Sequence, residues 1–178
     1  MEKIKLEKTI LGEAKKTNAL YGLVEKGDKI LVGLSGGKDS IAMVHLLKYY
    51  QEKLRMDFEF KPVVIHYGSI EEDEPLEKLK KYFVQYGIEV EIFRTNLKEL
   101  IEEKHKKNKS ICSFLARMRR GMLNKKALEW GANKIALGQH LDDAVETLFM
   151  SLIYSGRLSS MPPKYKSDNG LEIIRPLI

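Results

Sequence analysis

Residues 30–40 read ILVGLSGGKDS, and this junction constrains the fold more than any other part of the chain. Residues 29–34 form a short apolar run bounded by turn residues, which is typical of a strand buried on both faces. Asp39 and Ser40 then precede IAMVHLLKYYQ, whose apolar residues recur at helical spacing. A strand, a glycine-rich turn and a helix in succession predict one unit of an α/β fold.

The rest of the chain repeats this alternation. We therefore expect a doubly wound parallel sheet of about five strands, with helices on both faces. At 178 residues, the chain suits a single domain over 1–178, with residues 1–26 as a helix on or beside it. Further strands are predicted at 62–67, 88–93, 134–138 and 171–178, and helices at 3–24, 75–86, 97–103, 110–130 and 140–156.

Composition excludes several classes of protein. Charged residues make up 31% of the chain, and no apolar stretch approaches the roughly 20 residues that cross a bilayer. The N-terminus has no continuous apolar segment of a secretory signal, so we expect a cytoplasmic protein without a membrane partner. The net charge of +6 suits a polyanionic partner such as RNA. The single cysteine, Cys112, excludes an internal disulfide.

The turn at residues 35–40 has the composition of a phosphate-binding loop. Backbone N–H groups converge where a helix begins, and the helix dipole there favours negative charge. Asp39 would repel a phosphate unless a divalent cation joined the two, so this carboxylate predicts Mg²⁺. The alternative is a plain turn in which Asp39 caps the helix. The candidate phosphate-binding residues are Ser35, Gly36, Gly37, Lys38, Asp39 and Ser40.

Two common nucleotide-binding patterns do not fit this turn. A Walker A loop would need Gly in place of Val32 and Ser or Thr in place of Asp39. The glycine spacing of the dinucleotide fingerprint is also absent. The stretch SGGKDS after a strand instead resembles the PP-loop of ATP pyrophosphatases. That resemblance implies cleavage of ATP between the α and β phosphates.

A second motif, GQHLDDAVET at residues 138–147, also leaves a predicted strand and begins a helix. It places Asp142, Asp143 and Glu146 in the first turns. Acidic residues there can simply offset the helix dipole and need no ligand. Both motifs follow strands of one predicted parallel sheet, so they are expected at the same edge. Beside a triphosphate, two carboxylates can hold Mg²⁺ or orient the acceptor.

Further stretches narrow the resemblance. ICSFLARMRRG, KIALGQHLDDAVETLFM, SGRLSSMPPK, SDNG and IIRPL follow SGGKDS in order. Together they resemble the tRNA-cytidine 2-thiolation family (TtcA), from about Leu6 to Ile178. The resemblance implies an enzyme that uses ATP and Mg²⁺ to adenylylate a cytidine C2 oxygen in tRNA, before sulfur replaces that oxygen. Candidate partners besides tRNA are a sulfur carrier or desulfurase and a second copy of the chain.

The resemblance also assigns roles to individual residues, some of which have a purely structural alternative. His140 and His66 could be packed side chains, and the arginines a solvated helix face. The implied catalytic residues are Asp39, Arg119, Asp142 and Asp143, with Mg²⁺ at Asp39 and Asp143. The implied nucleotide contacts are Gly138 and His140. His66 is a further candidate because it lies at the end of a predicted strand, near the expected nucleotide site. The implied RNA contacts are Arg117, Arg120, Arg157 and Lys164.

The chain departs from the family at its cysteines. The family carries a C-x-x-C pair and a third cysteine that hold an iron–sulfur cluster, whereas this chain has Cys112-Ser-Phe-Leu115. Leu115 cannot ligate iron and thiolate clusters need several cysteines, so we expect no cluster. Cys112 is either an activated thiolate that carries sulfur or a small buried side chain.

Two functions of different kinds follow. In the first, the chain is an enzyme that adenylylates a tRNA base for thiolation, which the intact turn and the LDDxxET motif favour. In the second, it is a module that binds ATP and RNA without thiolation chemistry, which the missing cysteines favour. A third candidate, another PP-loop enzyme that amidates or attaches lysine, fits the ATP site but not the RRG and MPPK stretches.

Overall fold

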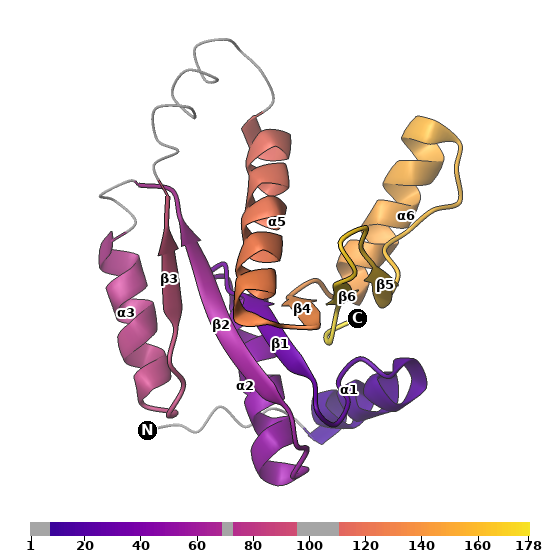
Figure 1. Cartoon of the computed structure of the whole chain (residues 1–178). Coiled ribbons are helices and arrows are strands. Elements are labelled where there is room, and N and C mark those ends of the chain that lie inside the picture. The colour runs from indigo at the N-terminus through magenta and orange to yellow at the C-terminus, as the bar shows by residue number, and fades with distance from the viewer. Residues whose placement is uncertain (1–7, 69–72, 96–110) are drawn as a thin grey trace.

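The computed structural model describes residues 8–68, 73–95 and 111–178, in which helices and strands alternate (Figure 1). No helix in these ranges is long and apolar enough to cross a membrane. The helices are α1 (Lys8–Tyr21), α2 (Lys38–Lys53), α3 (Asp73–Val84), α5 (Ile111–Trp130) and α6 (Leu141–Ser155). The strands are β1 (Lys29–Gly33), β2 (Glu59–His66), β3 (Glu91–Arg94), β4 (Lys134–Leu137), β5 (Lys164–Lys166) and β6 (Glu172–Ile174).

These strands form one mixed sheet in the order β3-β2-β1-β4-β6-β5. Strand β1 lies in the middle and pairs in parallel with β2 on one side and β4 on the other. Parallel neighbours need crossover connections, which the helices provide. Helices α2 and α3 cover one face of the sheet and α5 covers the other (Figure 1). The chain order reverses between β1 and β4, which is where open α/β sheets bind ligands.

The central strand, β1, contributes side chains to two apolar cores. Ile30 and Val32 of β1 point into the core shared with α2 and α3, and neither side chain is exposed. Leu31 points the opposite way, into the core shared with α5. This alternation follows from the two-residue period of a strand. It explains why residues 30–34 are apolar throughout, because both faces of β1 are covered by helices.

The predicted fold class is confirmed, with corrections to individual elements. The sheet has six strands and not about five, because β5 pairs with β6 in antiparallel fashion. Strand β5 has only three residues, KYK, without the apolar run that marks a buried strand. Helix α2 begins at Lys38, so Asp39 and Ser40 lie inside its first turn and not before it. The helix predicted at 97–103 lies outside the described residues.

The edge of the sheet where the parallel strands begin is held by a buried cation. Lys134, at the start of β4, is 3% exposed. Its Nζ lies 2.8 Å from Asp28 Oδ2, 3.0 Å from Glu25 Oε2 and 3.4 Å from Glu172 Oε2. Burial alone lowers the pKa of Lys134, but hydrogen bonds to Asp28 and Glu25 outweigh it and raise that pKa. The cluster therefore ties the segment after α1 to β4 and β6.

Replacing Lys134 with Met should lower the free energy of unfolding by about 3–5 kcal/mol, because buried Asp28 loses its cation. Urea unfolding measures the change. The folded-state pKa of Lys134 is raised, so its stabilisation is complete below the unfolded pKa of about 10.4 and is lost as pH rises through the folded value. The difference between the two proteins should therefore be constant near neutral pH and shrink only at strongly alkaline pH.

Lys26→Met is the matched control for this prediction. The Lys26 side chain is 84% exposed and lies 3.9 Å from Asp57. Exposed ion pairs contribute little, so the control should change the unfolding free energy by less than about 1 kcal/mol. Equal effects of the two substitutions would show that the buried cluster is not a stabilising element.

Candidate functional site

A cavity of about 520 Å³ opens at the edge where the parallel strands end. Its floor comes from the last residues of β1 and β2 and its walls from α5 and the segment after α6. Both sequence motifs contribute to it, so the predicted meeting of the two βα turns is found in the structure. The residues that line it are Gly33, Leu34, Ser35, Gly37, Asp39, Ser40, Val63, Val64, Ile65, Ala116, Arg119, Arg120, Leu123, Leu137, Gly138, Gln139, Met161, Tyr165 and Arg175.

The glycine turn, residues 35–40, is shaped by a buried hydroxyl. Ser40 is 4% exposed, and its Oγ donates to the Gly37 carbonyl oxygen at 2.8 Å. Ser40 Oγ also accepts a hydrogen bond from the Ser35 N–H at 3.2 Å and lies 3.1 Å from Ser35 Oγ. Gly36 has a φ of +82°, a conformation that a side chain would strain. Ser40 thus shapes the turn, and the backbone N–H groups at the start of α2 remain for an anion.

The second motif packs directly on the first through Gly138. A Cβ at this position would lie 2.9 Å from both the Cα and the N of Ser40. Only glycine allows this approach, because the neighbouring atoms are backbone atoms that cannot rotate away. The contact places the start of α6 beside the start of α2. The N-termini of two helices, each with unpaired N–H groups, therefore face the same region.

Three polar side chains meet beside the cavity. His140 caps α6: its Nδ1 accepts from the Asp143 N–H at 3.4 Å, and Asp143 Oδ2 accepts from the His140 N–H at 2.8 Å. The interpretation of Asp143 as a helix-capping residue is therefore confirmed. Because Nδ1 accepts, the neutral His140 ring carries its proton on Nε2, which lies 4.0 Å from Asp39 Oδ2. His140 thus lies between the carboxylates of Asp39 and Asp143, one from each motif. The side chain of Asp142, two residues after His140, is exposed.

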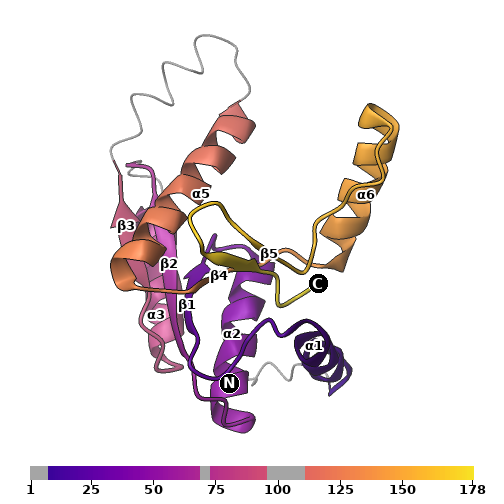
Figure 2. The same ribbon diagram turned by 45° about the vertical axis from the view of Figure 1, so that its right-hand side comes forward.

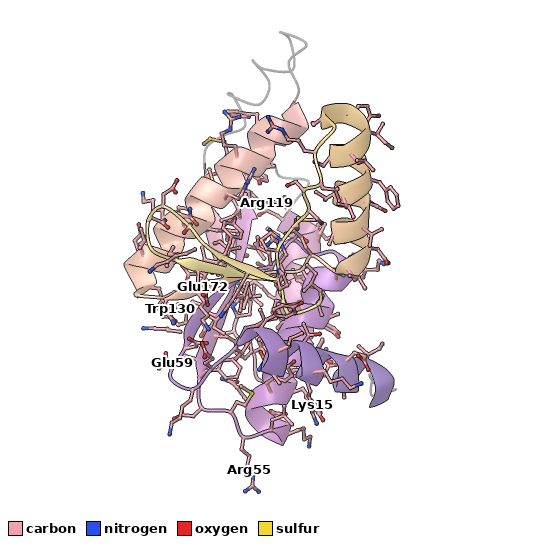
Figure 3. The ribbon with its side chains drawn as sticks, turned by 90° about the vertical axis from the view of Figure 1, so that its right-hand side faces the viewer. Lys15, Arg55, Glu59, Arg119, Trp130 and Glu172 are labelled. Carbon is pink, nitrogen blue, oxygen red and sulfur yellow. The ribbon has the colours of Figure 1, made fainter. Side chains whose placement is uncertain are left out.

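Helix α5 brings basic side chains to the opposite wall. Arg119 and Arg120 line the cavity, and the Arg119 Nε donates to the Tyr67 hydroxyl at 3.1 Å. Arg117 is exposed on the same helix. Figure 3 shows Arg119 well above Trp130, Glu59 and Glu172, which lie at the edge where the strands begin. The arginines and the glycine turn therefore belong to the same edge of the sheet.

Sequence reasoning missed a hydrogen-bonded pair in the cavity wall, the buried Arg175 and the half-buried Gln139. Arg175 is 6% exposed, and its Nε donates to Gln139 Oε1 at 2.6 Å while Nη1 donates to the Pro162 carbonyl oxygen at 2.6 Å. A guanidinium has only donors, so it fixes the amide oxygen of Gln139 toward itself and leaves the NH₂ group as a donor. Both residues stood within stretches that carried the family resemblance, IIRPL and GQHLDD.

A model of the PP-loop domain family matches residues 8–178. The chain belongs to the PP-loop domain family. We call its glycine turn, residues 35–40, the PP-loop, because SGGKDS resembles that motif. Proteins of Cronobacter sakazakii and Salmonella arizonae, each named tRNA-cytidine(32) 2-sulfurtransferase, are 39% identical to it over 174 residues. The matches cover 97% of this chain but 56% and 55% of the relatives, so the chain spans about half of their length.

Two solved structures are also similar to this chain. The U34-tRNA thiolase NcsA of Methanococcus maripaludis, solved with its [4Fe-4S] cluster, has a TM-score of 0.70 and 25% identity, covering 94% of this chain and 58% of its own. The NH₃-dependent NAD synthetase of Campylobacter jejuni has a TM-score of 0.57 and 14% identity, covering 95% and 66%. The second likeness concerns the fold alone.

Some predicted site residues are not among those that line the cavity. His66 is 2% exposed at the end of β2, where its Nδ1 accepts from the Gly68 N–H at 3.0 Å and its Nε2 lies 3.3 Å from Asp73. Lys164 lies 3.8 Å from Glu172 and 3.4 Å from the Gly22 carbonyl oxygen. Arg157 follows the end of α6. Cys112 lies in the first turn of α5, and its side chain is outside the described residues.

Replacing Gly138 with Ala should damage both stability and nucleotide binding, because the new Cβ would push the PP-loop away from the start of α6. Overpacking of this kind costs about 1–3 kcal/mol. Urea unfolding measures the loss, and titration with ATP should show weaker binding than in the unchanged protein.

Gly12→Ala is the control for this substitution. Gly12 lies in α1, and an added Cβ would meet nothing within 4 Å. Alanine favours a helix over glycine by roughly 0.5–1 kcal/mol, so the control should be slightly more stable and bind ATP unchanged. A Gly138→Ala protein as stable as this control would contradict the tight contact between the two motifs.

Proposed function

We propose that this PP-loop protein binds ATP in the cavity and transfers AMP to the C2 oxygen of a tRNA cytidine, which prepares the base for 2-thiolation. The observation that carries the proposal is the meeting of the PP-loop, the Asp39–His140–Asp143 group and the α5 arginines around one cavity. The relatives named for cytidine 32 of tRNA support cytidine as the acceptor.

The proposed first step is a displacement at the α-phosphorus of ATP. The cytidine C2 oxygen forms a bond to phosphorus, and the bond from phosphorus to the bridging oxygen of pyrophosphate breaks. Negative charge grows on the leaving pyrophosphate, where the N–H groups at the start of α2 and the Lys38 ammonium stabilise it. Arg119 and Arg120 can hold the α-phosphate or the tRNA backbone, for which a guanidinium is well shaped.

The donor set beside the PP-loop fits Mg²⁺ bound together with a nucleotide. Among the described residues, no group of three or more His, Cys, Asp or Glu side chains could hold a metal alone. Mg²⁺ in nucleotide sites is usually held by one or two carboxylates together with phosphate oxygens. Asp39 and Asp143, on either side of His140, are the carboxylates that would hold it. When bound, the ion would neutralise phosphate charge.

Sulfur transfer is proposed to depend on an external donor. A sulfur nucleophile adds at C2 of the adenylylated base, and the bond between C2 and the activated oxygen breaks to release AMP. The chain has one cysteine, so its residues do not fit a cluster such as the one named for the M. maripaludis thiolase. Sulfide balances this step directly. A persulfide on a sulfur carrier or desulfurase would add through its outer sulfur, and a second thiol on that donor would then have to cleave the S–S bond and form a disulfide with the carrier sulfur.

ATP labelled in the α-phosphate, incubated with Mg²⁺ and bulk tRNA, should yield AMP and pyrophosphate only when tRNA is present. Asp39→Asn should reduce AMP formation at least about 10²-fold, because it removes a charge from the reaction centre. Asp168→Asn, at an exposed position in the turn before β6, should leave the rate unchanged. Chromatography of the nucleotides measures AMP formation by the unchanged protein and by the two variants. Formation of ADP, or ATP binding without turnover, would favour the ATP- and RNA-binding module instead.

Arg119→Met should reduce AMP formation by about 10²-fold, because the cavity loses a cation that faces the phosphates. Arg119→Lys should recover only part of the loss, since an ammonium cannot make the paired contacts of a guanidinium. Arg55→Met is the control, because Arg55 is exposed at the end of the molecule remote from Arg119 (Figure 3). If all three variants kept the original rate, Arg119 would have no part in the reaction.

A further inference from the structure

One wall of the cavity is built where the chain returns to the sheet after α6. There β6 pairs with β4, and β5 pairs with β6 (Figures 1 and 2). The side chains that this wall turns to the cavity are Gln139 from the loop after β4, Met161, Tyr165 of β5 and Arg175 just after β6. None of the four carries a carboxylate, and only the arginine is charged. The wall therefore differs in chemistry from both the PP-loop and the Asp39–His140–Asp143 group.

Arg175 is held in one position by three contacts. Its Nε donates to Gln139 Oε1 at 2.6 Å, and its Nη1 donates to the Pro162 carbonyl oxygen at 2.6 Å. Its guanidinium carbon lies 5.4 Å from the centre of the Tyr165 ring, an arrangement that favours a cation. At 6% exposed, Arg175 offers little surface of its own to a ligand. It is therefore placed to act on a ligand through Gln139.

The contact with Arg175 decides which way the Gln139 amide faces. A guanidinium has only donors, so the amide oxygen must be turned toward it and the NH₂ group away from it. Gln139 is half-buried and lines the cavity, and the hydrogen bonds within the described part of the chain include none from this NH₂ group. The charged partner also polarises the amide, which strengthens the NH₂ group as a donor. Gln139 thus offers the cavity a donor and is prevented from offering an acceptor.

The position of Gln139 favours the acceptor base as its ligand. Gln139 directly precedes His140, whose Nε2 lies 4.0 Å from Asp39 Oδ2, so its amide belongs to the polar end of the cavity. The β and γ phosphates of ATP fit the PP-loop, and the acceptor must approach the α-phosphorus opposite the leaving pyrophosphate. Enzymes that act on a base take it out of its stack and read its Watson–Crick edge by hydrogen bonds. A fixed donor beside the reacting group is suited to that reading.

Such a donor distinguishes two pyrimidines that would react at the same atom. Cytosine and uracil both carry an oxygen at C2. The neighbouring N3 is a hydrogen-bond acceptor in cytosine, whereas in uracil it carries a hydrogen and is a donor. An amide NH₂ group at this edge pairs with cytosine and meets a second donor in uracil. Sites built to hydrogen-bond one substrate reject the analogue that leaves their polar groups unpaired.

We propose that Gln139, held by Arg175, selects cytidine over uridine as the acceptor by donating from its amide NH₂ group to N3 of the base. The proposal rests on the function proposed above, because it concerns the acceptor of that reaction. Gln139 is the specificity-determining residue. Arg175 is a positioning residue, which acts through the amide oxygen of Gln139. The C2 oxygen of the base is left free to react.

Binding of two RNAs tests the proposal. They are anticodon stem-loops that differ only in cytidine or uridine at position 32, the position in the names of the relatives, titrated in the presence of α,β-methylene-ATP to prevent turnover. The unchanged protein should bind the cytidine RNA at least about 10-fold more tightly. Gln139→Glu should remove or reverse this preference. Arg175 would hold one carboxylate oxygen, and the other would accept from the N3–H of uridine.

Gln85→Glu is the matched control, because Gln85 is exposed after the end of α3 and does not line the cavity. It should leave the ratio of the two dissociation constants unchanged. Arg175→Met should lower that ratio without reversing it, since the Gln139 amide could then turn over. Arg175→Lys, which can still donate to the amide oxygen, should keep more of the preference. Circular dichroism and titration with ATP check that each variant folds and binds nucleotide.

AMP formation with the same two RNAs separates this proposal from the reaction itself. If the unchanged protein formed AMP with neither RNA, the proposed adenylylation would be wrong, but a binding ratio shifted by Gln139→Glu would still support the role of Gln139. Equal binding of the two RNAs by the unchanged protein would overturn that role. An unchanged ratio in Gln139→Glu would overturn it as well, and weaker ATP binding by that variant would then place the amide at the nucleotide.

Discussion

The close contact of Gly138 with Ser40 is the interaction on which the rest of the site depends. Two βα turns from different parts of the chain meet there, backbone against backbone, because position 138 has no side chain. Without this approach, the PP-loop and the LDD motif would lie on neighbouring strands but would not share a cavity. The buried Ser40 hydroxyl adds to it by holding the PP-loop in shape from within. The site is therefore preorganised by packing before any ligand binds.

Charged side chains are arranged differently at the two ends of the parallel strands. Where the parallel strands begin, acidic side chains surround the Lys134 ammonium, so the charges are neutralised inside the protein. Where they end, Arg119 and Arg120 on α5 face the cavity without a carboxylate ion pair among the described contacts. Charge paired within the fold stabilises it, whereas charge left at a cavity favours an anionic ligand. This division agrees with the placement of ligands at the ends of strands in open α/β sheets.

Local patterns predicted much of the fold and part of the site. An apolar run followed by SGGKDS specifies a strand, a turn and a helix within a dozen residues, so β1, the PP-loop and α2 could be read directly. The pairing of Arg175 with Gln139 could not, because 36 residues separate them and only the sheet brings β6 beside β4. Strand β5 was missed because three polar residues gain their partners only from β6. Periodicity predicted α6 as a helix but could not tell which of its faces the rest of the chain covers.

The single cysteine of this chain bears differently on the two steps of the proposed reaction, activation of the base and delivery of sulfur. Activation of a base by ATP requires an anion site, carboxylates and cations, and the residues around the cavity provide all three. Delivery of sulfur by the protein itself would require thiolates, of which this chain has only Cys112, at the start of α5. Gly138 and Ser40 shape the PP-loop, which an ATP-binding module needs as much as an enzyme does, so it is the carboxylates and arginines around the cavity that favour activation. The residues present therefore support the proposed adenylylation, with sulfur supplied by another molecule.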